Sequence, residues 1–276
     1  MDKLQVLIVS KGHFYNHDSF LAMFEAMEDV ETTLVEQPAA QVLLRPDHVE
    51  DYDVVLFYDM SGIPGAGLTH DRASDDGQPT EDYRRSVEAL IERGKGIVLL
   101  NHAAVSWPEW PLWRAITGSS FMLKAGALDG KQVPGSGYRG GHGPHPNATF
   151  RAAPVAAHPV LEGIEGGFEV TDELYLKTAD FESRVLPLMR AEYDFVVENF
   201  SPPPLAPPEE QAEWGHPPGS DLVVWAHSAA ASPVVVSELG DGPAAFENPG
   251  FRLLLHNALR WTASSEARAW AAKRQG

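Results

Sequence analysis

The segment Gly94–Ser106 constrains the fold of this 276-residue chain more than any other. The apolar run Gly96–Leu100 stops abruptly at Asn101 and His102, and Pro108 then opens a helical pattern. A buried strand that ends in a polar turn before a helix is typical of open α/β sheets, which bind their ligands at the carboxyl edge. Many hydrolases and amidotransferases carry a nucleophile in such a turn. Here the turn carries Asn101 and His102, so we expect an active-site turn with a different chemistry.

The rest of the first half alternates strand and helix patterns. Apolar or β-branched runs predict strands over residues 4–9, 32–35, 54–58 and 96–100. Helical spacing and capping residues predict helices over residues 19–27, 80–93 and 108–116. This alternation implies an α/β fold with parallel strands joined by right-handed crossovers. The loops after the first, third and fourth strands would bring to one rim His13, His17, Asp18, Asp59, Asn101 and His102.

The second half is less regular and is expected to decorate the same domain. Strands are predicted over residues 150–155, 168–170, 185–189, 222–225 and 234–239, the last two as a closing hairpin. Residues 125–146 are predicted to form a glycine-rich loop. Residues 201–220, with seven prolines, are predicted to form an irregular or mobile surface insertion. An amphipathic helix follows from residue 248 or 249. We therefore predict one domain over residues 1–264 and a C-terminal tail over residues 265–276.

Composition excludes several classes of function. The formal charge of −18, with no Lys/Arg cluster, repels phosphate groups, so no nucleic acid and no anionic membrane is expected as a partner. The chain has no cysteine, which rules out disulfides, thiolate zinc sites, iron–sulfur clusters and thiol nucleophiles. No Gly-x-Gly-x-x-Gly motif follows the first strand, and we expect neither a nucleotide nor a flavin.

Three further features bear on where the protein works. No apolar run approaches the ~18 residues of a membrane span. A strand begins almost at Met1, which leaves no room for a signal peptide. Together with the absence of disulfides, these features predict a cytoplasmic protein. The tryptophan-rich and apolar edges are compatible with a homodimer.

Short motifs spread over nearly the whole chain resemble those of one family. They are Gly12-His-Phe with His17-Asp18, Asn101-His102 with Trp107 and Trp110, Phe121, His158-Pro-Val-x-x-Gly163, Asp172-Glu-Leu-Tyr175, Val224-Trp225, Leu239-Gly-Asp-Gly242, Asn248-Pro-Gly-Phe251 and Arg260-Trp261. Their order resembles the ThuA-like (trehalose utilisation) family of the class I glutamine-amidotransferase-like superfamily. The resemblance implies a flavodoxin-like three-layer sandwich with a mostly parallel central sheet. It also implies a role in carbohydrate metabolism, with disaccharides such as trehalose or their 3-keto derivatives as substrates.

Two residues are the leading candidates for catalysis. His102 carries an imidazole with an ordinary pKa near ~6.5, which suits a general base, a general acid or a metal ligand. Glu173 would be its partner, as a general acid or a metal carboxylate. Its neighbour Asp172 would point to the opposite face of the extended chain and cap a turn.

Two more residues would complete the catalytic group. His17 matches the motif of the resembling family better than His13 does, although the His17-Asp18 pair suits the start of a helix equally well. Asp241 stands where many relatives carry a histidine. The alternative is an ordinary Asp-Gly turn.

Six residues are predicted to bind substrate, and His142 could instead be a mobile surface histidine. They are His13, Asn101, Trp107, Tyr138, Arg139 and His142. Tyr138 and Arg139 would hydrogen-bond sugar hydroxyls or simply pack their loop. Trp107 would stack on a pyranose ring or pack in the core. A divalent metal, if one binds, would use nitrogen and oxygen ligands from among His102, His142, His145 and Glu173.

These expectations combine into one prediction with one alternative. We predict a hydrolase or lyase that acts on a disaccharide, glycoside or 3-keto-sugar by histidine and carboxylate acid–base chemistry. The alternative is a non-catalytic carbohydrate-binding or regulatory protein on the same fold. A glutamine amidotransferase is excluded because the chain has no cysteine, and Ser106 lies too far into the following helical region to act as a serine nucleophile.

Overall fold

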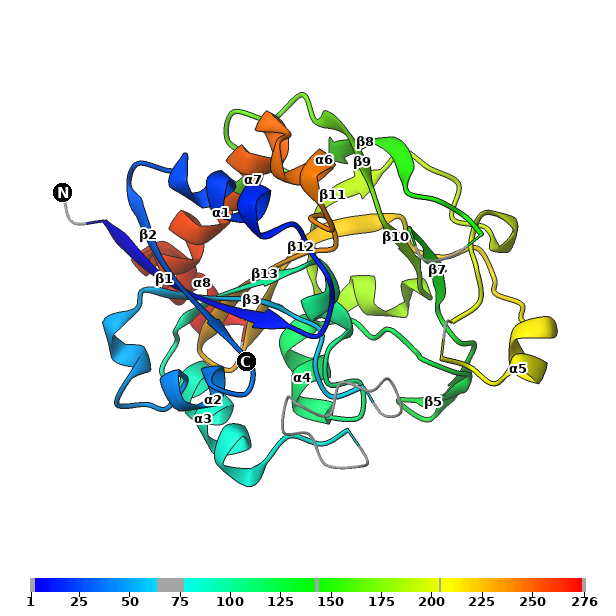
Figure 1. Ribbon diagram of the computed structural model, residues 1–276, viewed down its shortest axis with the longest axis horizontal. Coiled ribbons are helices and arrows are strands. Elements are labelled where there is room, and N and C mark those ends of the chain that lie inside the picture. The colour runs from blue at the N-terminus through cyan, green and yellow to red at the C-terminus, as the bar shows by residue number, and fades with distance from the viewer. Residues whose placement is uncertain (1–2, 64–76, 142–143, 204, 275–276) are drawn as a thin grey trace.

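The computed structural model describes residues 3–63, 77–141, 144–203 and 205–274 (Figure 1). Within these ranges nine strands form one sheet: β1 (Leu4–Lys11), β2 (Val30–Glu36), β3 (Val54–Asp59), β4 (Gly96–Leu100), β8 (Ala148–Pro154), β9 (Phe168–Asp172), β11 (Leu186–Ala191), β12 (Leu222–Ala229) and β13 (Ser232–Ser237). Two short antiparallel pairs stand apart from it: β5 (Gly126–Leu128) with β6 (Lys131–Val133), and β7 (Gly137–Arg139) with β10 (Leu174–Leu176).

The helices alternate with strands in the first half and follow them at the end. The α-helices are α1 (His17–Glu25), α2 (Ala40–Leu43), α3 (Glu81–Glu92), α4 (Pro111–Thr117), α5 (Pro208–Ala212), α6 (Pro243–Phe246), α7 (Pro249–Ala263) and α8 (Ser265–Lys273). Short 3₁₀ segments are η1 (Val49–Asp51), η3 (Asn101–Val105), η4 (Pro159–Leu161), η5 (Ala179–Arg184) and η6 (Val197–Asn199). Across the described ranges, none of the helices has the length and apolar character needed to cross a bilayer.

The sheet has a parallel half and an antiparallel half. Its order is β2-β1-β3-β4-β13-β12-β11-β8-β9. From β2 to β13 each strand is parallel to its neighbour, and this order is that of flavodoxin-like sheets. The predicted flavodoxin-like fold is thus confirmed. The expectation of a mostly parallel sheet is too strong, because the tight β12–β13 hairpin reverses the chain and β11, β8 and β9 continue antiparallel.

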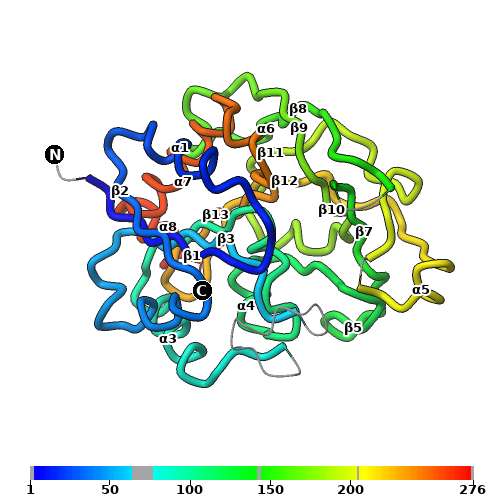
Figure 2. Tube along the Cα trace, viewed as in Figure 1, coloured from blue at the N-terminus to red at the C-terminus, as the bar shows by residue number. Residues whose placement is uncertain are grey.

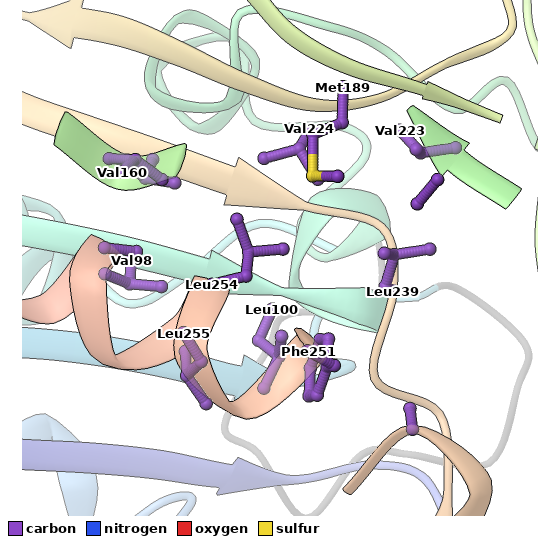
Figure 3. Close-up of a cluster of buried hydrophobic side chains, with 14 of the residues drawn as sticks. Val98, Leu100, Val160, Met189, Val223, Val224, Leu239, Phe251, Leu254 and Leu255 are labelled. Carbon is purple, nitrogen blue, oxygen red and sulfur yellow. The ribbon is translucent and has the colours of Figure 1, made fainter. Parts of the chain in front are cut away.

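Alternate residues of the parallel strands enter two separate cores. In β4, Val98 and Leu100 pack in one core with Phe251, Leu254 and Leu255 of α7 (Figure 3). The intervening residues of β4 pack in the other core with α3 and α4. Helices α1, α6 and α7 lie on one side of the sheet, and α2, α3 and α4 lie on the other (Figure 1). The result is the predicted three-layer sandwich.

Three segments of the second half are more ordered than expected. The predicted tail contains helix α8, which Ser264 caps and which buries Ala267 and Ala271. The predicted glycine-rich loop contains β5, β6 and β7. The proline-rich segment contains α5, and its Ser201 pairs with the backbone of Tyr138 through bonds of 2.8 and 2.9 Å. The described part of this segment therefore joins β7, at the end of the molecule away from β2 (Figure 2).

Gly12, directly after β1, offers a test of this backbone. Its φ is +91°, and a Cβ atom there would lie 1.9 Å from the carbonyl oxygen of Met60. Gly12→Ala is therefore expected to lower the free energy of unfolding by roughly 2–3 kcal/mol in a urea titration. Gly166→Ala is the matched control, because a Cβ there meets nothing within 4 Å. Equal stability of the two variants would contradict the described loop.

Candidate active site

Three side chains from distant parts of the chain meet at the carboxyl edge of the sheet. His102 follows β4, Glu173 connects β9 to β10, and Asp241 follows β13. One nitrogen or carboxylate oxygen from each lies within 4.8 Å of those of the other two. The His102 Nε2 atom lies 3.2 Å from Glu173 Oε2, and these two side chains are only 12% and 2% exposed. His102, Glu173 and Asp241, here called the cluster, form a compact acid–base group.

Both carboxylate oxygens of Glu173 are engaged. Tyr138 Oη donates a hydrogen bond to Oε1, and Tyr175 Oη donates one of 3.0 Å to Oε2. The two tyrosines meet because Tyr138 of β7 pairs with Tyr175 of β10. Gly140 allows this approach, since a Cβ atom there would come within 2.4 Å of Glu173 Oε1. These contacts hold the carboxylate in one orientation toward His102.

Asp172 has a different role from its neighbour Glu173. Its side-chain oxygens accept hydrogen bonds from the backbone N–H groups of Glu173 at 2.9 Å, Gly240 at 2.7 Å and Asp241 at 3.2 Å. Burial raises the pKa of Asp172 to about 7, although these three donors favour its ionised form. Asp172 thus joins the backbone of Glu173 to the turn that carries Asp241.

His102 and Glu173 keep each other ionised. Burial alone lowers the pKa of His102, but the hydrogen bond and the charge of Glu173 more than compensate and raise it above its ordinary value. Burial alone raises the pKa of Glu173, but the hydrogen bond and the charge of His102, with the hydrogen bonds of the tyrosines, bring it below its ordinary value. The contact is therefore an imidazolium–carboxylate pair at mildly acidic pH.

His13 is a second imidazole in the site, in the opposite charge state. Its ring centroid lies 4.5 Å from that of His102. Its Nε2 atom lies 2.8 Å from the carbonyl oxygen of Tyr58, which can only accept a hydrogen bond, so Nε2 carries a hydrogen. Burial, together with the neighbouring His102, lowers the pKa of His13 to about 3. A neutral His13 thus lies beside a charged His102.

The cluster lies beside a cavity of about 610 Å³, which is within the usual size of small-molecule sites. Its polar lining includes His13, His102, Tyr138, Tyr175 and Asp241. A second cavity of about 540 Å³ lies beside α4, and its described lining contains no member of the cluster. Of these two cavities, the first is therefore the one that borders the cluster.

Of the four residues predicted to be catalytic, the structure brings three together and leaves His17 apart. His17 is the exposed first residue of α1, where Asn16 Oδ1 accepts the capping hydrogen bond from the N–H of Ser19 at 2.9 Å. The ring of His17 stacks on Tyr15 at 4.2 Å. The start of the helix turns His17 outward, and His13 lines the cavity in its place.

Asn101 and Trp107, predicted to bind substrate, are buried in the turn instead. Asn101 adopts a φ of +49°, which asparagine tolerates better than most residues, and its Nδ2 donates to the carbonyl oxygen of Glu238 at 3.0 Å. Trp107 is fully buried, with its ring 6.4 Å from that of Trp110. Among the described lining residues of the first cavity neither side chain is present. Both support the turn that carries His102.

The remaining candidates are spread around the site. Tyr138 contacts Glu173, as described above. Arg139 faces elsewhere: its guanidinium donates to the carbonyl oxygen of Asn199 at 3.0 Å and lies 5.4 Å from the ring of Tyr193. His142 lies outside the described residues. His145 is half-buried and is not part of the described group of mutually close ligand atoms.

Some residues of the site were not singled out from the sequence. Tyr175 lies two residues after Glu173 in an extended segment, so the period of a strand could have placed both on one face. Ser201, Leu205 and Gln211 line the cavity from the proline-rich segment. No local pattern predicts that contact, because it depends on the long-range pairing of Ser201 with Tyr138.

A buried ion pair lies near the cluster. Lys177 Nζ contacts Glu238 Oε1, and both side chains are buried. The same Nζ lies 4.7 Å from the ring centroids of Phe181 and Trp225, a cation–π arrangement. Lys177 directly follows β10, and Glu238 directly follows β13. The pair therefore ties together the two segments that carry the carboxylates of the cluster.

Fold and site together define an α/β protein of flavodoxin-like topology, with an acid–base cluster at the carboxyl edge of its sheet. A model of the ThuA family, described as trehalose utilisation, matches residues 5–262. The chain therefore belongs to the ThuA family, which connects it with the use of a sugar.

Solved structures share this fold. The chain is similar to a ThuA-like protein from Parabacteroides merdae, with a TM-score of 0.63 and 18% identity over 95% of this chain and 91% of that one. A ThuA-like protein from Bacteroides uniformis gives a TM-score of 0.63 and 18% identity over 96% and 93%. A cytoplasmic protein from Salmonella typhimurium gives a TM-score of 0.54 and 9% identity over 94% of this chain and 99% of that one. At these identities the likeness shows the fold alone. No curated protein matches the chain.

The buried ion pair predicts a strong and non-additive effect on stability. Lys177→Met leaves the carboxylate of Glu238 buried without its partner and is expected to cost roughly 3–5 kcal/mol in chemical denaturation. The double variant Lys177→Met, Glu238→Leu replaces the pair by apolar side chains and is expected to recover most of that loss. Additive losses in the double variant would show that the two groups do not interact.

The cluster predicts a pH-dependent contribution to stability in protein treated with a chelator. Because the pKa of His102 is raised in the folded state, its protonation stabilises the fold fully at pH values below the ordinary pKa of 6.5. This stabilisation is lost as the pH rises through the folded-state pKa. Because the pKa of Glu173 is lowered in the folded state, its ionisation stabilises the fold fully at pH values above the ordinary pKa of 4.5. This stabilisation is lost as the pH falls through the folded-state pKa. The stability lost in Glu173→Gln should therefore be largest between about pH 5 and 6.5.

Urea unfolding of the wild type and Glu173→Gln across the pH range checks this expectation. Glu88→Gln, at an exposed position of α3, serves as the control and should change stability little at any pH. A loss in Glu173→Gln that does not vary with pH would contradict an ionised pair.

Proposed function

We propose that this protein is an enzyme that acts on a glycoside, a disaccharide or a 3-keto-sugar by acid–base chemistry. One observation carries the proposal: a buried imidazole–carboxylate pair and a second carboxylate lie within 4.8 Å of one another beside a cavity of about 610 Å³. Groups of this kind, with pKa values shifted by burial and by each other, are typical of catalytic sites. Membership of the ThuA family supports a sugar as the substrate.

The chemistry follows from the charge states of the cluster. In a 3-keto-glycoside the proton on C2 is acidic because it lies next to the ketone. Asp241 would take this proton as the base, and the resulting enolate would expel the oxygen on C1. His102, as the imidazolium, would give its proton to that leaving oxygen. The products are an unsaturated keto-sugar and an alcohol, and a proton passed from Asp241 to His102 restores the cluster.

Other residues would position this acid and this base. Glu173 keeps His102 protonated and oriented, while Tyr138 and Tyr175 hold Glu173. The carboxylate of Asp172 holds the turn that carries Asp241 by accepting a hydrogen bond from the backbone N–H of Asp241. Hydrolysis would need the same two proton transfers, with water added at C1.

A divalent cation fits the donor set of the cluster. His102, Glu173 and Asp241 offer imidazole nitrogen and carboxylate oxygens, which suit Zn²⁺ or Mn²⁺ in a chain without cysteine. These three residues would hold the ion with His102 as the neutral imidazole, so the imidazolium role described above applies to the protein without the ion; a bound ion would supply polarisation of the carbonyl group of a keto-sugar. We also propose that the protein acts on a small-molecule carbohydrate, as its family suggests, and that it works in the cytoplasm, as its composition suggests.

Turnover of 3-keto-glycosides by purified variants tests the proposal. His102→Ala and Glu173→Gln are expected to lower kcat/KM by about 10²–10⁴-fold, the usual contribution of a general acid or base. His17→Ala is the control, because that histidine is exposed on α1, and should retain the wild-type rate. Wild-type rates in both cluster variants would refute the assignment. Sugar binding without turnover by the wild type would instead favour a carbohydrate-binding protein.

A further inference from the structure

The cavity beside the cluster has an exposed apolar rim. Four large hydrophobic side chains stand out as exposed among the described residues: Phe14 at 90%, Val155 at 47%, and Val42 and Leu205 at 43% each. Phe14 and Leu205 both line this cavity, although they come from segments far apart in the chain, and Leu205 also lines the cavity beside α4. Exposed apolar side chains that gather at a cavity are a common mark of a binding site.

The backbone holds Phe14 in its exposed position. The rings of His13 and Tyr15, on either side of it, both pack edge-on against Tyr58, with centroids 4.6 and 5.0 Å away. Phe14 lies between these two anchored residues, and its own side chain is 90% exposed and therefore outside that aromatic group. The exposure of Phe14 is therefore built into the loop after β1.

An apolar wall continues inward from the rim. Val105 and Phe121 are buried against Tyr138 and Tyr175, and Met60 and Leu123 pack on this group. All six line the cavity. Tyr138 and Tyr175 donate hydrogen bonds from their hydroxyl groups to Glu173, so they present their apolar rings to a ligand in the cavity. The polar groups His13, His102 and Asp241 thus share the cavity with a larger apolar surface.

We propose that the substrate is a glycoside whose aglycone is an apolar, aromatic group. This inference rests on the proposed function, because it places the sugar beside His102 and Asp241. The aglycone then lies between the apolar wall on one side and Phe14 and Leu205 on the other. A disaccharide carries hydroxyl groups around both of its rings, and each of them would need a polar partner when buried.

Isothermal titration calorimetry with three ligands tests this inference on the whole protein. The ligands are phenyl glucoside, methyl glucoside and trehalose, with both anomers of each glucoside. Burial of the phenyl ring predicts that phenyl glucoside binds at least about tenfold more tightly than either of the others. Phe14→Ala and Leu205→Ser should each weaken phenyl glucoside severalfold and leave methyl glucoside unchanged. Val155→Ala, an exposed apolar position outside the cavity, should change neither.

Each other outcome overturns the inference in a distinguishable way. Trehalose or methyl glucoside binding as tightly as phenyl glucoside would refute the aromatic aglycone and leave the proposed sugar chemistry standing. Binding of none of the three would refute the inference, and turnover of a 3-keto-glycoside by the same protein would show that the proposed function survives it. Dissociation of a dimer in Phe14→Ala, measured by analytical ultracentrifugation, with unchanged affinity for phenyl glucoside, would assign the rim to a second copy of the chain.

Discussion

The hydrogen-bonded contact between His102 and Glu173 joins the two halves of this molecule. His102 belongs to the turn after β4 in the parallel half, and Glu173 belongs to the β9–β10 connection of the antiparallel half. A buried charge of either kind is costly alone, and here each one stabilises the other. Tyr138 and Tyr175 satisfy the remaining hydrogen-bonding capacity of Glu173. The turn that carries a nucleophile in many related folds therefore presents a charged imidazole.

The fold explains why these groups meet. Parallel strands bring the loops after β1, β3, β4 and β13 to one edge, as in other flavodoxin-like sheets. The antiparallel extension and the small β7–β10 pair then build a second wall across that edge. The buried ion pair of Lys177 and Glu238 links the two walls to each other. The first wall supplies His102 and Asp241, the second supplies Glu173, and both supply apolar surface.

The sequence predicts the parts of this structure that depend on local pattern. The strands of the parallel half, the cap of α3 at Thr80 and the polar turn at His102 follow from apolar runs, capping residues and topology. In sequence His17 fits a helix start and a catalytic loop equally well, and the structure places it at the exposed start of α1. The contact of Tyr138 with Glu173 and the packing of the proline-rich segment depend on pairings between distant residues, which periodicity does not encode.

The central claim is that the cluster, rather than the neighbouring cavity beside α4, receives the sugar. A crystal structure of the Glu173→Gln variant soaked with phenyl glucoside tests it most directly. We predict that the oxygen on C1 lies within hydrogen-bonding distance of His102 and that Asp241 faces C2 of the sugar. A sugar bound beside α4, or bound with its C1 oxygen remote from His102, would contradict the account.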